Sequence, residues 1–200
     1  MRVGLLMGSF NPIHIAHIAM ITECLNNNIV DKVFVVPTMC NPWKKGSDML
    51  PFKTRVRMIE LSLLPFEGKA SVCDIEKTIE PPFFSYKTLN KLRKVMPYHT
   101  FSIIAGTDVV NSMTQWRNWH TDIKDEHNVI CICRDGEEPT YNEEDFPLGV
   151  TVIKGASSNM AISSTMIRNM VSEGKIPYPY VTNEVFEIIK KYEKDNNLQS

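Results

Sequence analysis

Hydrophobic residues recur along the chain in two alternating patterns. Short continuous apolar runs, typical of strands buried on both faces, alternate with segments whose apolar residues share one face of a helix. The predicted strands are Val3–Met7, Lys32–Pro37, Ala70–Cys73, Thr100–Ala105, Asn128–Cys133 and Val150–Ile153. The predicted helices between them are Ile15–Leu25, Phe52–Leu64 and Tyr86–Val95. This alternation predicts an α/β fold with an open parallel sheet, which binds its ligands at the carboxyl ends of the strands.

Beyond the last predicted strand, the pattern becomes purely helical. Ser163 or Ser164 can cap a first helix, and Thr182 begins an amphipathic last helix. We therefore expect a single domain with a core over residues 1–155 and a helical C-terminal part over residues 156–200.

Composition and charge exclude several classes of partner. The 200 residues are 43% hydrophobic and carry a formal net charge of -1, so we expect no nucleic-acid partner. No apolar run reaches the roughly 18 residues that a membrane helix needs, and Met1 is followed by a strand-like run without a basic leader. The five cysteines are scattered and odd in number, which favours reduced, structural thiols. These features predict a cytoplasmic protein without a membrane partner.

The most informative motif follows the first predicted strand and reads Gly8-Ser-Phe-Asn-Pro-Ile-His-Ile-Ala-His17. The glycine allows backbone N–H groups to approach an anion closely. His14 and His17 fall on one side of a helix start, where each could act as a cation or as a neutral N–H donor. A lone histidine would more often be structural, but this pair after a glycine turn predicts a phosphate site.

A second motif, Ile162-Ser-Ser-Thr-Met-Ile-Arg168, lies in the helical C-terminal part. It gathers hydroxyls and free N–H groups at a helix start, with Arg168 one turn later. The arrangement suits a polyphosphate, whereas the alternative is an ordinary capped helix with a surface arginine.

A third motif, Gly106-Thr-Asp108, ends a predicted strand. Its carboxylate could accept hydrogen bonds from ribose hydroxyls, or it could cap a helix over Val109–Thr114, and both roles can coexist. Trp116 and Trp119 follow, and either indole could be part of the core or a stacking platform for a flat ring.

Two lysines, Lys44 and Lys45, lie in the long loop after the second predicted strand. Lysines on a loop are usually solvated, but at the carboxyl end of a strand these two could close over phosphates.

These motifs resemble a known family. His14-Ile-Ala-His17 resembles the H-x-G-H signature of the nucleotidyltransferase superfamily, and Ile162–Arg168 resembles its second signature. With Gly106-Thr-Asp108, Trp116 and Arg134 in family order, the chain from Val3 to about Tyr192 is similar to the bacterial nicotinate-nucleotide adenylyltransferases.

The resemblance implies a Rossmann-like open parallel sheet with helices on both faces and a small helical C-terminal portion. It implies adenylyl transfer from ATP to nicotinate mononucleotide, which gives nicotinate adenine dinucleotide and pyrophosphate in NAD biosynthesis. Mg²⁺ would accompany ATP, with no resident metal site, and a homo-oligomer is possible. The attacking phosphate is already anionic, so catalysis would consist of positioning and charge stabilisation.

The resemblance also implies roles for individual residues. The residues expected to act on the reacting phosphates are His14, His17 and Arg168. The residues expected to bind ATP are Gly8, Ser9, Phe10, Gly106, Asp108, Ser163, Ser164 and Thr165. The residues expected to bind the mononucleotide are Asn11, Lys44, Lys45, Ser85, Trp116 and Arg134.

Three residues depart from the family pattern. Ala16 replaces a glycine between the two histidines, Met7 stands where a glycine is common, and Ser85 replaces a threonine near the pyridine substituent. Ser85 bears on the acceptor, because nicotinate mononucleotide carries a carboxylate there and nicotinamide mononucleotide a neutral amide. Arg117 is compatible with the acid, but the sequence does not say where its side chain points.

Several alternative functions stay open. The acceptor could be nicotinamide mononucleotide, or the chain could be another small-molecule adenylyltransferase such as a phosphopantetheine adenylyltransferase. A different class is a non-catalytic nucleotide sensor, which would bind ATP without turnover.

Overall fold

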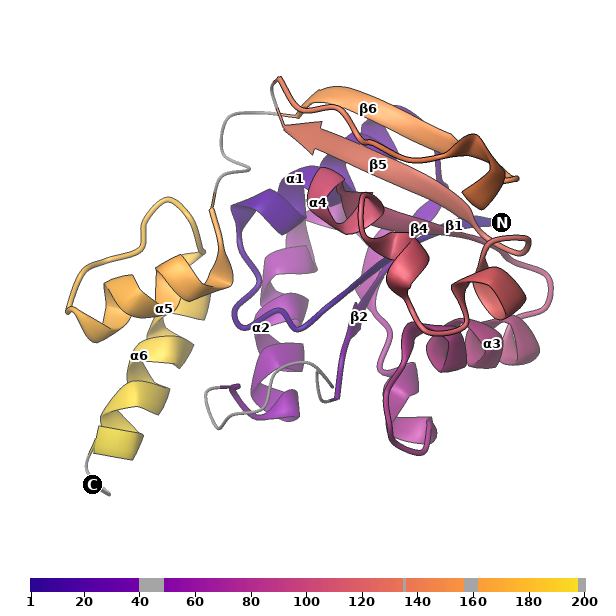
Figure 1. Cartoon of the computed structure of the whole chain (residues 1–200). Coiled ribbons are helices and arrows are strands. Elements are labelled where there is room, and N and C mark those ends of the chain that lie inside the picture. The colour runs from indigo at the N-terminus through magenta and orange to yellow at the C-terminus, as the bar shows by residue number, and fades with distance from the viewer. Residues whose placement is uncertain (40–48, 135, 157–161, 198–200) are drawn as a thin grey trace.

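A six-stranded sheet, parallel throughout, forms the centre of the molecule (Figure 1). The computed structural model describes residues 1–39, 49–134, 136–156 and 162–197. Along the sheet the strand order is β3-β2-β1-β4-β5-β6. The strands are β1 Arg2–Gly8, β2 Lys32–Pro37, β3 Ala70–Val72, β4 Thr100–Gly106, β5 Asn128–Arg134 and β6 Val150–Ala156. The predicted α/β fold with an open parallel sheet is confirmed.

Helices connect successive strands and complete the C-terminal part. The α-helices are α1 Ile15–Asn26, α2 Phe52–Leu63, α3 Ser85–Val95, α4 Thr107–Val110, α5 Ser164–Ser172 and α6 Asn183–Asn197. Short 3₁₀ or π-helical turns are η1 Leu64–Phe66, η2 Ile75–Thr78, η3 Met113–Gln115, η4 Trp119–Ile123 and η5 Glu143–Asp145. The three helices predicted between strands are all present.

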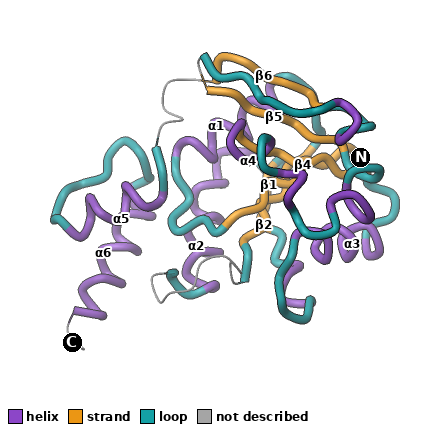
Figure 2. Tube along the Cα trace, viewed as in Figure 1, coloured by secondary structure: helices purple, strands orange, loops and turns teal. Residues whose placement is uncertain are grey.

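Two apolar cores lie on opposite faces of the sheet, because successive strand residues point to opposite sides. Leu6 and Ile104 pack with residues of α1, α2, α5 and α6, whereas Leu5 and Ile103 pack with residues of α3, α4 and η4. In Figure 2 the orange strands run between α1 and α2 on one side and α3 on the other. Burial on both faces explains why the strands read as continuous apolar runs.

The C-terminal helix α6 packs against α2, and α5 packs against α6 (Figure 1). Val185 and Ile189 of α6 enter the same apolar core as α1 and α2. The Ile15 N–H, at the start of α1, donates to the Tyr180 carbonyl at 2.9 Å. The C-terminal part is therefore packed directly against the N-terminal motif.

The described cysteines are buried or half-buried free thiols, and the fifth, Cys40, lies outside the described residues. The sulfurs of Cys131 and Cys133 lie 3.7 Å apart on one face of β5. Burial raises the pKa of Cys24 and Cys131 to about 12, which keeps both thiols protonated. The described residues contain no helix with the length and apolar character needed to cross a membrane.

Candidate functional site

The direction in which successive strands are added to the sheet reverses between β1 and β4. From β1 the chain builds β2 and β3 towards one edge, and from β4 it builds β5 and β6 towards the other. Open α/β sheets bind ligands in the crevice at such a switch point, beyond the carboxyl ends of the strands. Gly8 ends β1 and Gly106 ends β4, so the first and third sequence motifs meet at this crevice.

The turn after β1 is built around a buried ring. Phe10 has a φ of 47°, in the left-handed region, and only 2% of its surface is exposed. Its ring packs edge-on against His17, with ring centroids 5.0 Å apart. A Cβ placed on Gly8 would come within 3.3 Å of the Phe10 ring, so the glycine gives this ring its space. The turn therefore has a packed interior that fixes its shape.

The two histidines are in direct contact at the start of α1. His14 is the residue that precedes the helix and is 6% exposed, and its ring centroid lies 3.8 Å from that of His17. The His14 backbone N–H donates to His17 Nδ1 at 3.3 Å. Because Nδ1 of His17 accepts this bond, the neutral imidazole carries its proton on Nε2. His14 Nδ1 is buried without a hydrogen-bond partner among the described residues.

Burial keeps both imidazoles neutral in this structure. Desolvation lowers the pKa of His14 to about 4. Desolvation, together with the neighbouring His14, lowers the pKa of His17 well below its ordinary value. The sequence left open whether these rings act as cations or as neutral donors, and at neutral pH the geometry favours neutral donors until an anion arrives.

We expect the free energy of unfolding to fall as the pH is lowered from about 6.5 towards 4. An unfolded histidine takes up its proton near pH 6.5, whereas folded His14 does so only near 4, so protonation favours the unfolded chain. This shift corresponds to a loss on the order of 3 kcal/mol for His14. Urea unfolding of the wild type and of His14→Gln across this window measures it. Identical slopes with pH in the two proteins would contradict the assignment.

The C-terminal motif reaches directly back to the N-terminal turn. Ser164 Oγ donates to the Pro12 carbonyl at 2.8 Å, across 152 residues of sequence. Arg168 Nη1 donates to the Asn11 carbonyl at 2.7 Å, and Nη2 lies 3.5 Å from Thr165 Oγ1. These bonds place the guanidinium and the start of α5 beside the turn that carries the histidines.

Ser163 is the cap of α5. Its Oγ accepts from the Met166 N–H at 3.2 Å, so of the two serines considered as caps it is Ser163 that fills this position. Its neighbour Ser164 is thereby left to bond the N-terminal turn.

Asp108 does not cap a helix. The residue that precedes α4 is Gly106, and α4 ends at Val110, so the alternative of an Asp108 cap on a helix over Val109–Thr114 is wrong. Asp108 lies exposed in the first turn of α4. A Cβ on Gly106 would come within 3.0 Å of Asp108 Oδ1, so the glycine leaves room for the carboxylate. The Asp108 carboxylate is thus presented to solvent at the carboxyl end of β4.

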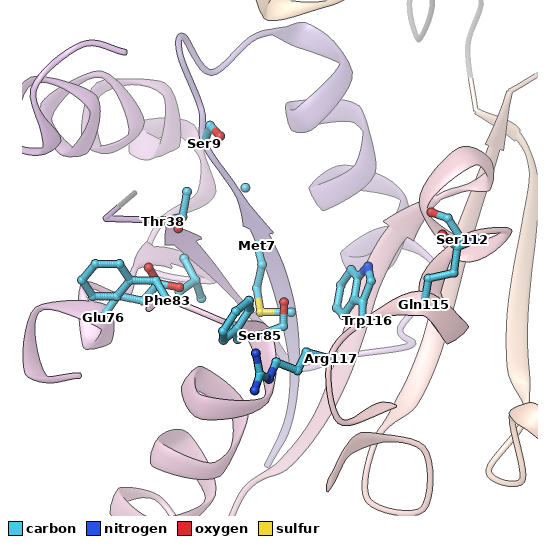
Figure 3. A pocket seen from close by; sticks show the side chains of 13 residues that line it. Met7, Ser9, Thr38, Glu76, Phe83, Ser85, Ser112, Gln115, Trp116 and Arg117 are labelled. Carbon is cyan, nitrogen blue, oxygen red and sulfur yellow. The ribbon is translucent and has the colours of Figure 1, made fainter. Parts of the chain in front are cut away.

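A pocket of about 480 Å³ lies next to the turn, between the ends of β1 and β2, the start of α3 and the segment after η3 (Figure 3). It contains four residues that the sequence assigned to nucleotide binding: Gly8, Ser9, Ser85 and Trp116. The remaining lining residues are Met7, Val36, Thr38, Glu76, Phe83, Phe84, Ser112, Gln115 and Arg117. Met7, a departure from the family pattern, therefore occupies space in this pocket.

The two neighbouring tryptophans differ in environment. Trp119 is 1% exposed, packs on Phe146 and donates its indole N–H to the Asp145 carbonyl at 3.1 Å. Trp116 is only half-buried and lines the pocket. Trp119 is thus a core residue, and Trp116 is the indole available to a ligand.

Arg55 is a site residue that sequence reasoning missed. Its guanidinium is fully buried and donates to three carbonyls: Ser9 at 2.7 Å, Thr38 at 2.8 Å and Leu50 at 2.9 Å. It thereby joins the segments that follow β1 and β2. The sequence does contain one indication that Arg55 is buried: it falls on the same face of α2 as Met58 and Ile59.

Glu76 is a second residue that sequence reasoning missed. It is 6% exposed, and its two carboxylate oxygens accept from the Met39 N–H at 2.8 Å and from Thr88 Oγ1 at 3.0 Å. Burial raises the pKa of this carboxyl, while these hydrogen bonds oppose the rise. Glu76 thus gives one wall of the pocket a carboxyl group that already has partners.

Several predicted residues lie apart from the pocket lining. Asn11 Oδ1 accepts from the Leu50 N–H at 3.0 Å, and Arg134 is exposed at the end of β5, 3.7 Å from Glu137. Lys44 and Lys45 lie outside the described residues. Ala16 is buried in the apolar core shared with α2, so its methyl is part of that core.

Comparison with known proteins adds the evolutionary context of this site. Residues 5–170 match the model of the cytidylyltransferase-like family. A protein of Flavobacterium johnsoniae named "Probable nicotinate-nucleotide adenylyltransferase" is 32% identical, with 94% of this chain and 96% of that protein covered. A protein of Bacteroides thetaiotaomicron with the same name is 30% identical over 96% of this chain and 92% of its own length.

Solved structures share the fold. Plasmodium falciparum nicotinic acid mononucleotide adenylyltransferase complexed with NaAD superposes with a TM-score of 0.78 at 21% identity, covering 96% of this chain and 95% of that one. The same enzyme complexed with APC gives a TM-score of 0.77, with 96% of both chains covered. At this level of identity the likeness describes the Rossmann-like architecture.

Proposed function

The chain belongs to the nicotinate-nucleotide adenylyltransferases of the cytidylyltransferase-like family, and from this we propose that it transfers the adenylyl group of ATP to nicotinate mononucleotide. The products are nicotinate adenine dinucleotide and pyrophosphate. The observation that carries the proposal is the direct joining of the histidine turn to α5 beside a pocket lined by Trp116. The resemblance read from the sequence motifs is confirmed.

In the proposed reaction, the phosphate of the mononucleotide attacks the α-phosphorus of ATP, and the bond to pyrophosphate breaks. The nucleophile is already an anion, so the protein has to position two polyanions and stabilise the charge that develops between them. The Nε2–H of His17 is a donor for this charge, and His14 adds a second imidazole at the same helix start. An approaching phosphate favours protonation of either ring, because an anion raises a histidine pKa.

The other groups divide between the two substrates. Arg168 and Ser164, fixed to the turn, would hold the pyrophosphate end of ATP, with Ser163 and Thr165 at the same helix start. Asp108 would accept from the ribose of ATP, with Gly106 leaving it room. Ser85 and Trp116 would receive the pyridine ring in the pocket, whose volume of about 480 Å³ lies within the usual range for small-molecule sites.

Magnesium would enter with ATP. Among the residues that the structure describes, no group of three or more His, Cys, Asp or Glu side chains is placed to hold a metal ion. At phosphate-transfer sites Mg²⁺ is commonly held by phosphate oxygens and water together with one or two carboxylates. Bound there, Mg²⁺ would neutralise charge on the leaving pyrophosphate. Asp108 is the exposed carboxylate at the crevice that could reach it.

The rival to this proposal is a nucleotide sensor that binds ATP without turnover. Measuring ATP binding by calorimetry and pyrophosphate release with nicotinate mononucleotide, on one preparation, separates the two. We expect binding and steady release of pyrophosphate. Binding of ATP without release, with nicotinate or nicotinamide mononucleotide supplied, would support the sensor instead.

The cytoplasmic location and the oligomeric state remain predictions.

Replacing Trp116 with alanine should raise the KM for the mononucleotide far more than the KM for ATP. The indole supplies a stacking face in the pocket, and such stacking is worth about 1–3 kcal/mol, or roughly 5- to 150-fold. Steady-state kinetics with one substrate varied at a time measures both constants. Equal increases in the two KM values would reject the stacking role.

A further inference from the structure

Arg117 differs from every other arginine of the chain in its surroundings. Arg2, Arg57, Arg93 and Arg134 each lie within 4.0 Å of a carboxylate, with the shortest contacts at 2.6 Å. Arg55 and Arg168 donate to backbone carbonyls. Arg117 has no such partner among the described residues. In the described part of the chain, its positive charge is therefore not paired with a carboxylate.

The Arg117 side chain is directed into the pocket rather than away from it. It lines the pocket, and its guanidinium carbon lies 5.0 Å from the centroid of the Phe84 ring. Figure 3 shows it reaching from its own segment towards Ser85 and Met7. Attraction by an aromatic face holds a guanidinium in place without using its N–H donors. Arg117 is thus anchored next to the start of α3 with its fork available to a ligand.

The two charged side chains that line the pocket differ in their hydrogen-bond partners. Arg117 is the one cationic side chain among the described lining residues, and Glu76 is the one acidic side chain. Glu76 is engaged by Met39 and Thr88 in the wall beside the end of β2. Ser85, in place of the family threonine and next to Phe84 in the chain, contributes a hydroxyl side chain to the pocket lining. The region between Arg117 and Ser85 is therefore suited to a carboxylate.

We propose that Arg117 is the residue that selects the acceptor, by pairing its guanidinium with the ring carboxylate of nicotinate mononucleotide. The inference rests on the proposed function for the identity of the two substrates. A planar guanidinium matches a carboxylate with two parallel hydrogen bonds, whereas a neutral carboxamide offers one acceptor oxygen and no charge. The same pocket therefore discriminates the acid from the amide by charge.

The test compares binding and turnover of both mononucleotides in wild type and Arg117→Gln. For nicotinate mononucleotide we expect kcat/KM to fall about 10- to 100-fold and Kd to rise by a similar factor, the usual effect of losing a charge-assisted pair. For nicotinamide mononucleotide we expect both constants to change less than about 3-fold. Arg117→Lys keeps the charge without the fork and should restore part of the preference.

Arg93→Gln is the matched control, because Arg93 is a half-exposed arginine on α3 that pairs with Glu126 away from the pocket lining. It should leave both mononucleotides unaffected. If the wild type is active but Arg117→Gln has the same ratio of the two kcat/KM values as the wild type, the role of Arg117 is overturned and the proposed reaction is not. A wild type without turnover would overturn the proposed reaction. Selective loss of nicotinate mononucleotide binding in Arg117→Gln would still support the inference in that case.

Discussion

Replacing His17 with alanine is expected to lower turnover by about 10²–10³-fold, the typical loss for one preorganised donor to developing charge. The ring is positioned by contacts that leave its Nε2–H for the substrate: the His14 N–H binds its Nδ1, His14 lies against its face and Phe10 meets it edge-on. Such a donor needs no reorganisation when charge develops on the phosphates. The loss should therefore fall on kcat more than on either KM.

The matched control is His120→Ala, because His120 is an exposed histidine whose ring contacts Asp145 rather than the crevice. Single-turnover kinetics of both variants, with thermal unfolding recorded in parallel, separates chemistry from stability. A folded His17→Ala protein with turnover near that of His120→Ala would remove His17 from the reaction.

Replacing Arg55 with methionine is expected to lower the free energy of unfolding by about 3–5 kcal/mol, the range for breaking a buried charged network. Methionine fills much of the same volume but leaves the carbonyls of Ser9, Thr38 and Leu50 without their buried donor. Glu76 would also lose the favourable influence of a nearby positive charge. Activity should fall as well, because Ser9 and Thr38 line the pocket.

Arg57→Met, two residues along the same helix, is the control for this change. Arg57 is exposed and has a 3.6 Å contact with Glu60, a pair of the kind worth at most about 1 kcal/mol. Urea titrations of the two variants measure the difference. A loss in Arg55→Met no larger than in Arg57→Met would contradict the account of Arg55 as the group that fixes the two segments.

The fold followed from the sequence because burial on both faces leaves a plain pattern. Continuous apolar runs such as Lys32–Pro37 coincide with strands, since neither face of a central parallel strand reaches water. The histidine turn was recognisable for a similar reason: a glycine, a helix start and paired imidazoles are all local features. The meeting of this turn with α5 depends on contacts such as that of Ser164 with Pro12, which no local pattern encodes.

Other features depend on tertiary contacts and could not be predicted from local sequence. The sequence predicts that Gly8 leaves room for an anion, and the fold gives this glycine a second role that the sequence does not indicate, which is to leave space for the Phe10 ring. The alternative of Asp108 as a cap fails because α4 begins two residues too early for that role, with Gly106 as the preceding residue. The direction of Arg117 depends on Phe84, which lies on another element. Arg55 was not predicted as a buried residue, because burial of a cation is favourable only where several acceptors surround it. Here the acceptors are carbonyls from separate segments of the chain, which only the tertiary structure brings together.

The central claim is that the histidine turn, α5 and the Trp116 pocket together join ATP to a pyridine mononucleotide. The most direct measurement is mass-spectrometric identification of the products after incubation with ATP, Mg²⁺ and nicotinate mononucleotide. The account predicts nicotinate adenine dinucleotide and pyrophosphate in equal amounts, with little dinucleotide in His17→Ala. Consumption of ATP without a dinucleotide, or the same dinucleotide yield and initial rate in His17→Ala, would contradict it.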